Sequence, residues 1–291
     1  PIMSNATLLE VSDVTVEYVT QGQRFAAISD VTLDIAEGET LGLVGESGCG
    51  KSTTGRAIIQ LPTPTAGQVK FEGQELTGLT HNDMRPIRQR LQIIFQDPVS
   101  SLNPRRRVKD IVAEPLIIDG LKNTAEIDRK VREVLNAVGM DPDITMDRRP
   151  HQFSGGQCQR ICIARALIME PKLIVCDEPV SALDVSVQAQ ILNLLEDMKE
   201  RYGLTLLFIS HDLAVVKNIS DRVAVMYLGK FCELADSERI YQAPAHPYTA
   251  GLMATIPEIG DKAIDNAQAL AGEIPSPLNP PSGCRFRTRC P

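Results

Sequence analysis

Polar and apolar residues alternate along the first part of the chain and give way to short apolar runs further on. Residues 8–18 and residues 28–35 place alternate apolar side chains on one face, which predicts two strands. Residues 40–44 predict a short strand that leads into a glycine-rich loop, and residues 68–71 predict another strand after two prolines. Strands joined by tight turns indicate an antiparallel subdomain near the N-terminus.

Helical spacing and bare apolar runs alternate in the rest of the chain. Thr124 can cap a helix that closes at Gly139, Asp212 can cap another, and residues 187–198 carry an apolar helical stripe. Apolar runs at residues 91–95, 173–176, 205–209 and 223–228 have the length of buried strands. Together they predict an α/β fold whose mostly parallel sheet is covered by helices on both faces.

Composition narrows the functional classes. Of the 291 residues, 43% are hydrophobic and 23% are charged, as in ordinary globular proteins. The net charge of −7 argues against nucleic acid as the main partner. The longest apolar runs fall well short of the roughly 18–20 residues that cross a bilayer, so a membrane role requires docking to other subunits. Seven cysteines, an odd number, suit a reducing compartment better than a disulfide framework.

The strongest motif is Gly-Glu-Ser-Gly-Cys-Gly-Lys-Ser at residues 45–52, a complete G-x-x-x-x-G-K-[ST] phosphate loop between a strand and a helix. Its glycines allow backbone N–H groups to turn inward around phosphate oxygens, and the helix dipole adds about half a positive charge. Lys51 would reach the β- and γ-phosphates, and the Ser52 hydroxyl would bind Mg²⁺. The alternative is a glycine-rich turn with an incidental lysine, which we disfavour in this context.

Two further motifs follow. Asp177 and Glu178 end the apolar run 173–176, at the sheet edge where ligands bind. Asp177 would hold Mg²⁺ and Glu178 would polarise the attacking water as a general base, although acidic strand ends are often structural. Phe-Ser-Gly-Gly-Gln at residues 153–157 precedes a helix expected over residues 158–169. Its N–H donors form either a second anion site, which hints that two copies share each nucleotide, or an ordinary helix cap.

In this order, the phosphate loop, the Ser-Gly-Gly-Gln signature and the Asp-Glu pair resemble the ATPase cassette of ABC proteins, from about residue 8 to residue 236. The resemblance implies a P-loop NTPase core with a mostly parallel sheet, an N-terminal antiparallel β subdomain and an inserted helical subdomain at about residues 97–165. The nucleotide-binding domain would occupy residues 1–245. The proline-rich residues 246–291 would form a C-terminal extension, which we expect to be truncated.

The same resemblance implies roles for single residues. Gln96 is similar to the glutamine that touches Mg²⁺ and the attacking water, and His211 to the switch histidine at the γ-phosphate. Asp184 ends a Ser-Ala-Leu-Asp loop that links the two ATP sites, and Tyr18 is placed to stack on adenine, unless it is a core residue or Phe25 replaces it. The expected catalytic residues are Lys51, Gln96, Glu178 and His211, and the Mg²⁺ ligands are Ser52, Gln96 and Asp177. The expected nucleotide-binding residues are Tyr18, Gly45, Glu46, Ser47, Gly48, Cys49, Gly50, Lys51, Ser52, Thr53, Gln96, Ser154, Gly155, Gly156, Gln157 and Asp184.

A narrower resemblance concerns the importer branch for oligopeptides and dipeptides. It is carried by residues 95–105 and 178–188 and by the tail motifs from His246-Pro-Tyr-Thr to Cys290. The sister branch for nickel shares much of this pattern, so nickel stays an alternative to peptides. Some family members hold an iron–sulfur cluster in the tail; four thiolates are normally needed, and Cys284 and Cys290 would form only a partial site unless the tail is completed.

The sequence therefore predicts an ATP- and Mg²⁺-dependent ATPase that powers import of peptides or related solutes. The resemblance implies a second cassette, identical or related, two transmembrane permease subunits, whose coupling helix would dock near residues 96–105, and indirectly a solute-binding protein. It places the chain peripherally on the cytoplasmic face of the inner membrane, without a nucleic-acid partner. The alternatives are a soluble ABC ATPase acting on nucleic acid or the ribosome, and a regulatory module that binds ATP without turnover.

Overall fold

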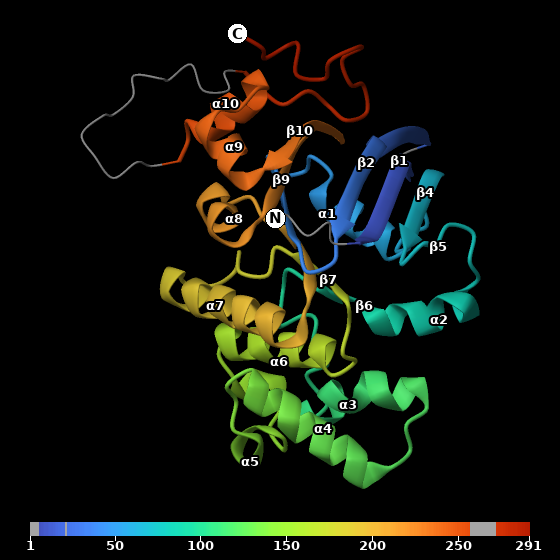
Figure 1. The fold of residues 1–291 in the computed structure, drawn as a ribbon, viewed down its shortest axis with the longest axis vertical. Coiled ribbons are helices and arrows are strands. Elements are labelled where there is room, and N and C mark those ends of the chain that lie inside the picture. Colours follow the sequence, from blue (N-terminus) through green and yellow to red (C-terminus); the bar gives the residue numbers. More distant parts are fainter. Residues whose placement is uncertain (1–5, 21, 257–271) are drawn as a thin grey trace. The chain divides into compact units, whose positions relative to one another are not determined.

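The computed structural model describes residues 6–20, 22–256 and 272–291, and the chain divides into two units (Figure 1). The first unit combines the described residues up to Thr80 with those from Leu207 onward. The second unit contains His81–Leu206.

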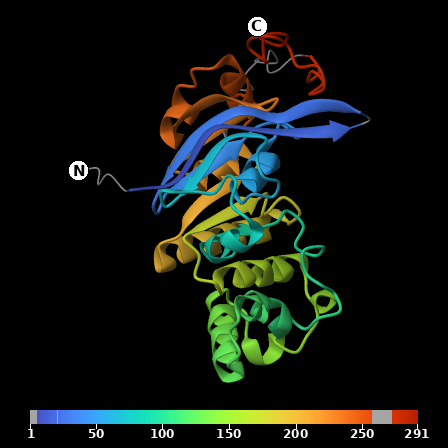
Figure 2. The same cartoon turned by 90° about the vertical axis from the view of Figure 1, so that its right-hand side faces the viewer.

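A long antiparallel hairpin in the first unit is formed by β1 (Thr7–Thr20) and β2 (Gln23–Ala36), seen as the long blue strands of Figure 2. With β4 (Ala66–Phe71) and β5 (Gln74–Glu75) they form a sheet of order β2-β1-β4-β5. Val11 and Val14 are consecutive buried positions of β1, three residues apart, because the pairing register of β1 with β2 shifts between them. Asp13, at this shift, has a φ of 50°. The Thr32 hydroxyl accepts from the Asp13 N–H at 2.9 Å and stabilises this bulge, which explains the imperfect alternation in the sequence.

The second sheet of this unit has the order β10-β9-β3-β8. Its strands are β3 (Thr40–Val44), β8 (Thr205–Ile209, in this unit from Leu207), β9 (Arg222–Tyr227) and β10 (Lys230–Asp236). β9 runs parallel to β3, β10 is antiparallel to β9, and β3 is buried along its whole length. The helices of the unit are α1 (Lys51–Ile58), α8 (Leu213–Ile219), α9 (Ser237–Gln242) and α10 (Pro247–Met253).

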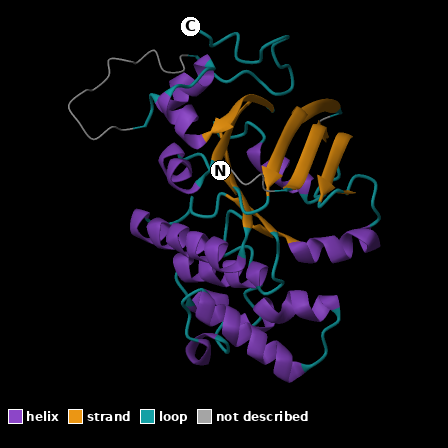
Figure 3. Ribbon diagram, viewed as in Figure 1, coloured by secondary structure: helices purple, strands orange, loops and turns teal. Residues whose placement is uncertain are grey.

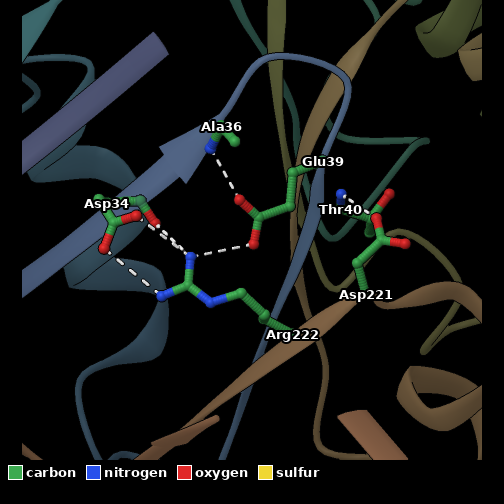
Figure 4. A network of polar contacts seen from close by, with 6 residues as sticks. All are labelled: Asp34, Ala36, Glu39, Thr40, Asp221 and Arg222. Carbon is green, nitrogen blue, oxygen red and sulfur yellow. Dashed lines mark hydrogen bonds and ion pairs between the residues drawn. The ribbon is translucent and has the colours of Figure 1, made fainter. Parts of the chain in front are cut away.

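A polar network connects β2 of the first sheet with the start of β3 and β9 in the second sheet (Figure 4). One terminal nitrogen of Arg222, at the start of β9, lies 3.2 Å from a carboxylate oxygen of Asp34 in β2 and 3.2 Å from one of Glu39. The neighbouring Asp221 carboxylate accepts from the Thr40 N–H at 2.7 Å. The strand that feeds the phosphate loop is therefore fixed at its beginning by charge-assisted hydrogen bonds.

The second unit is mainly helical (Figure 3). Its two full strands, β6 (Leu91–Ile94) and β7 (Leu173–Asp177), pair in parallel. The helices are α2 (His81–Arg90), α3 (Val108–Asp119), α4 (Thr124–Ala137), α5 (Pro142–Thr145), α6 (Gly155–Leu167) and α7 (Val185–Tyr202), with a 3-10 turn at Pro150–Gln152. Within the described parts of the chain, no helix is both long and apolar enough to cross a membrane.

Several predicted elements are confirmed, including the strand at residues 40–44 and the helix capped by Asp212. Two details of the prediction are wrong. Asn123 caps α4, because its side-chain oxygen accepts from the N–H groups of residues 125 and 126, and Thr124 is already the first helical residue. α6 begins at Gly155, not at residue 158. The predicted domain boundaries, at residue 245 and at about residues 97–165, stay predictions.

Candidate nucleotide-binding site

The phosphate loop connects β3 to α1 in the first unit, as the motif predicts. α1 begins at Lys51, and Gly50 at its N-cap has left-handed backbone angles. The buried Lys51 ammonium donates to the carbonyl oxygens of Gly45 at 2.8 Å and Glu46 at 3.1 Å. The lysine thus lies inside the curve of the loop, where it can meet phosphate oxygens.

Two glycines of the loop are required by close approach of other backbone. A Cβ at Gly45 would lie 2.1 Å from the carbonyl oxygen of Met226, and one at Gly50 would lie 2.8 Å from that of Ala27. Both glycines also have φ values, 153° and 111°, that L side chains rarely adopt. Substitution at either position would displace the loop from the strands that hold it.

The rest of the loop suits an anionic ligand. Its first helical turn reads Lys-Ser-Thr-Thr and carries no carboxylate, while Ser52 and Thr53 are half-buried there. Burial raises the pKa of the Cys49 thiol against the opposing effect of the Lys51 charge, so Cys49 is neutral at pH 7. The backbone N–H groups, the helix dipole and the lysine therefore supply a positive potential that the loop's cysteine does not reduce.

Tyr18 lies near the tip of the β1–β2 hairpin, directly opposite Phe25. The two ring centroids are 6.1 Å apart, and Tyr18 is 39% exposed. The alternative that Tyr18 is an ordinary core residue is therefore wrong, because the residue is exposed. An exposed ring of this kind can stack on a base.

His211 follows β8 in the first unit and is exposed. The N–H of Ser210 donates to the Leu43 carbonyl at 3.1 Å, which places the end of β8 beside the end of β3. Since β3 leads into the phosphate loop, His211 lies at the same carboxyl edge of the sheet as that loop. This edge is where ligands bind in parallel α/β sheets.

The second unit brings Gln96 and Glu178 together. β6 and β7 are parallel, so Gln96 and the acidic pair follow at the same carboxyl edge. The Gln96 amide donates to a Glu178 carboxylate oxygen at 2.8 Å, and the preceding Asp177 is only 1% exposed. Glu178 has a φ of 49°, a strained value for a residue with a side chain. The structure therefore gives Glu178 a defined orientation, as a general base requires.

The Ser-Gly-Gly-Gln signature forms the N-terminus of α6. The Ser154 hydroxyl accepts from the Gln157 N–H at 3.3 Å, and the Gln157 side chain accepts from the Ser154 N–H at 3.0 Å. A Cβ at Gly156 would lie 2.4 Å from a methyl of Val187, whereas the nearest atom to one at Gly155, on Leu183, would be 3.4 Å away. Ser154 and Gly155 are exposed, as is Asp184 at the N-cap of α7. The predicted cap is thus present, and it leaves the start of α6 accessible.

Sequence reasoning did not find two residues that contact the phosphate loop, Tyr248 and Arg289. The Glu46 N–H donates to the Tyr248 hydroxyl at 3.1 Å, and Arg289 binds the Glu46 carboxylate at 2.8 Å. These residues follow Glu46 by 202 and 243 positions, so no local pattern could have indicated them.

The predicted iron–sulfur site finds no support in the structure. Cys284 and Cys290 are both exposed, and among the described residues no group of three or more His, Cys, Asp or Glu side chains could hold a metal ion. The predicted Mg²⁺ ligands Ser52, Gln96 and Asp177 stay predictions; each carries a side-chain oxygen, the donor type that Mg²⁺ prefers.

A phosphate loop after a parallel strand, with an acidic pair at the end of another, defines the class of P-loop nucleotide-binding proteins. The profile of the family described as "ABC transporter" matches residues 28–181, and that of the "Oligopeptide/dipeptide transporter, C-terminal region" matches residues 232–291. A putative peptide import ATP-binding protein of Brucella ovis is 52% identical, covering 99% of this chain and 91% of the relative. The oligopeptide transport ATP-binding protein OppF of Escherichia coli is 52% identical, covering 98% and 88%.

Solved structures agree with these relatives. The dimeric ATP-binding cassette MJ0796, in a post-hydrolysis state bound to ADP and Pi, has a TM-score of 0.72 and 30% identity, covering 79% of this chain and 99% of that chain. The cbiO1 protein of Clostridium perfringens, part of the ABC transporter complex cbiONQ, has a TM-score of 0.72 and 26% identity, covering 81% and 91%. The chain belongs to the ABC transporter family, in the branch of the oligopeptide and dipeptide import ATP-binding proteins. The predicted family, fold class and ATPase class are confirmed.

Proposed function

We propose that this chain binds and hydrolyses ATP and thereby powers the import of peptides or related solutes through an ABC transporter. The hydrogen bond between Gln96 and Glu178, beside the buried Asp177, carries the proposal of hydrolysis. A protein that only binds ATP needs a phosphate loop, but it does not need a carboxylate held at the end of a strand by a neutral amide. The names of two relatives, a putative peptide import ATP-binding protein and an oligopeptide transport ATP-binding protein, support the solute class.

ATP binding is assigned to the first unit. The N–H groups of residues 45–53 and the Lys51 ammonium would hold the phosphates, and the exposed Tyr18 ring would stack on adenine. Ser52, Gln96 and Asp177 are the proposed ligands of Mg²⁺, which neutralises charge on the β- and γ-phosphates. Each of these side chains carries an oxygen atom that can coordinate a metal, and oxygen is the ligand that this hard cation prefers.

Hydrolysis is assigned to Glu178 as the general base. Its carboxylate would accept a proton from the attacking water, and Gln96 would orient both the carboxylate and that water. His211, at the carboxyl edge of the sheet, would contact the γ-phosphate. Removal of a general base typically lowers the rate by about 10²–10⁴.

A second cassette, either another copy or a related subunit, would complete each nucleotide site. The accessible N-terminus of α6 offers Ser154 and Gly155 to a phosphate bound on the opposite cassette, and Asp184 would link the two sites. The MJ0796 structure is described as dimeric, which supports this arrangement. Because the γ-phosphate joins the two cassettes, its hydrolysis would release them.

A groove in the second unit is the proposed docking site for a helix of a permease subunit. It has a volume of about 690 Å³ and lies between α2, β6 and α3, with apolar lining from Phe95, Pro115, Ile118 and Met169. Ile118 is 61% exposed. An amphipathic helix could place its apolar face in such a groove. Docking there would keep the chain peripheral on the cytoplasmic face of the inner membrane, with the solute-binding protein engaged only through the permeases.

The first test compares Mg²⁺-dependent ATP turnover of the chain with that of Glu178→Gln, while light scattering follows ATP-induced dimerisation. We expect turnover in the variant to fall by about 10²-fold or more and the dimer to persist. The control is Glu196→Gln, which removes an exposed carboxylate on α7 in the same unit. Unchanged turnover in Glu178→Gln would reject the assignment of the base.

A second test addresses the groove. Ile118→Asp should reduce co-purification with the permease subunits, because it places a charge among apolar groove residues. Ile144→Asp is the matched control, since Ile144 is similarly exposed, at 55%, on α5 outside the groove. Equal co-purification of both variants would reject the groove as the docking site. Transport by the reconstituted complex, measured with peptides and with nickel, would then identify the solute class.

A further inference from the structure

One residue of the phosphate loop, Glu46, is held by the C-terminal part of the first unit. Its backbone N–H donates to the hydroxyl of Tyr248 in α10 at 3.1 Å. Its two carboxylate oxygens accept from the two terminal nitrogens of Arg289, at 2.8 Å and 3.2 Å. Both the main chain and the side chain of this loop residue are therefore fixed by residues that follow it by more than 200 positions.

The pair between Arg289 and Glu46 differs from an ordinary surface ion pair. The Arg289 side chain is 4% exposed and that of Glu46 is 22% exposed, so water screens the pair weakly. The contact is bidentate, and the guanidinium also donates to the Tyr227 hydroxyl at 3.4 Å. The hydrogen bonds to Glu46 raise the pKa of Arg289, which keeps its positive charge at any physiological pH.

Aromatic packing explains why Arg289 reaches this position. The buried Phe286 ring lies 5.3 Å from the rings of both Tyr227 and Tyr248, and these two rings are 4.7 Å apart. Nearby, Arg285 donates to the Ser29 hydroxyl at 2.7 Å and to the Leu228 carbonyl. Phe286 and Arg285 thus anchor the segment on the strands beside the phosphate loop, three and four residues before Arg289.

The beginning of the same segment also lies next to the loop. A cavity of about 320 Å³ is lined on one side by loop residues 46–49 and on the other by residues 274–277. Tyr227 and Leu228 complete its lining. Residues 272–291, here called the tail segment, therefore border the loop at both of their ends.

The charge of Glu46 gives this contact a consequence for nucleotide binding. A carboxylate within a loop that binds a polyanion repels the ligand, and the repulsion grows where solvent screening is weak. Arg289 cancels this charge and holds the carboxylate to the side of the tail segment. Without the guanidinium, Glu46 would keep its negative charge and regain rotational freedom inside the phosphate loop.

We propose that the tail segment positions the phosphate loop for ATP and that Arg289 is the positioning residue, acting through Glu46. The proposal rests on the proposed nucleotide site, and it assigns to the C-terminal region a direct effect on nucleotide affinity. Tyr248 supports the same loop residue from the backbone side, with its phenol kept neutral because burial raises its pKa.

The test measures the Kd of a fluorescent ATP analogue for the full chain and for Arg289→Gln, with far-UV circular dichroism as a check of folding. We expect binding to weaken by about 3- to 30-fold, as follows from one uncompensated charge near a polyanion in a poorly screened site. The matched control is Arg287→Gln, which removes an exposed arginine from the same segment and should bind as the parent does. Equal affinities of the two variants would overturn the proposal.

A second variant distinguishes charge compensation from simple loss of the tail segment. In Glu46→Gln/Arg289→Gln the repelling carboxylate is gone as well, so most of the lost affinity should return; continued weak binding would overturn the positioning role. If Arg289→Gln does not fold, Arg289→Lys keeps the charge without the planar fork, and it should weaken binding by about threefold relative to Arg287→Lys. Hydrogen exchange of the amides of residues 45–50 should speed up in the Arg289 variants only.

Failure of the nucleotide site itself has a separate signature. Lys51→Ala should abolish binding in every background, because it removes the ammonium from the centre of the loop. Undiminished binding in Lys51→Ala would reject the proposed site. Loss of binding in Lys51→Ala with parental binding in Arg289→Gln would reject only the role of the tail segment.

Discussion

The two glycines of the Ser-Gly-Gly-Gln signature occupy adjacent positions of α6 but differ in the space around them. An alanine Cβ at Gly156 would lie 2.4 Å from a methyl carbon of Val187 in α7. At Gly155 the nearest atom, on Leu183, would be 3.4 Å away, which is an ordinary contact. Gly156→Ala should therefore destabilise the protein and Gly155→Ala should not.

The magnitude follows from two opposing effects. Overpacking by one methyl group costs about 1–3 kcal/mol, while alanine is favoured over glycine in a helix by at most about 1 kcal/mol, and by less in the first turn. The net loss for Gly156→Ala is about 0.5–2 kcal/mol, and Gly155→Ala should be neutral or slightly stabilising. For a domain of this size, about 1 kcal/mol corresponds to about 2–4 °C in Tm.

Thermal denaturation followed by circular dichroism compares the two variants with the parent chain. Gly156→Ala should melt a few degrees below Gly155→Ala. The double variant Gly156→Ala/Val187→Ala removes the methyl carbon that the new Cβ meets, so the cost of alanine at position 156 should shrink in the Val187→Ala background. Equal melting temperatures of the two glycine variants would refute the packing argument.

Three other substitutions test single interactions by urea denaturation. Asn123→Ala should lose about 1 kcal/mol of stability through the N-cap of α4, and Thr124→Ala should lose much less; equal losses would reject Asn123 as the cap. Arg222→Gln should cost about 1–3 kcal/mol because it leaves the carboxylate of Glu39, 9% exposed, without its guanidinium, and a loss below about 0.5 kcal/mol would contradict this (Figure 4). Partial burial raises the pKa of Glu233, but hydrogen bonds from the N–H groups of residues 245 and 246 outweigh it, and the pKa lies below its ordinary value of 4.5. The charged Glu233 therefore stabilises the fold above pH 4.5, and this stabilisation is lost as the pH falls through the lowered pKa. Glu233→Gln should be less stable than the parent at pH 7, and the difference in stability should disappear in acid. A difference that stays constant with pH would contradict this linkage.

Local patterns predicted the motif loops and most of the strands, but not β5 or β10, and some of the other differences have clear physical causes. α2 and α3 were not predicted, and both contain a proline, Pro86 and Pro115, which in a sequence reads as a helix breaker. The alternation of β1 breaks between Val11 and Val14, because a bulge inserts an extra residue there. A bulge depends on the partner strand, so periodicity within one strand cannot locate it.

The features of the candidate site also fall into two groups, those that local sequence patterns locate and those that depend on tertiary structure. The phosphate loop, the acidic pair and the signature are contiguous motifs, and the sequence located each of them. The exposure of Tyr18 depends on its place at the hairpin tip, and the contact of Arg289 with Glu46 depends on aromatic packing of a distant segment. Such features arise from tertiary structure, which spacing along the chain does not encode.

The signature residues allow a final prediction that separates fold from function. Ser154 and Gln157 satisfy each other's N–H groups, and Gly156 is required by the packing of α7, so the fold accounts for three of the four residues. It does not account for Gly155, which is exposed and has room for a methyl group. If Gly155 approaches a phosphate on the opposite cassette, a Cβ there would block that approach. In a Glu178→Gln background, Gly155→Ala should therefore keep its melting temperature and its affinity for ATP but lose ATP-induced dimerisation in light scattering. Retained dimerisation would mean that the start of α6 is a helix cap and does not form the second half of the nucleotide site.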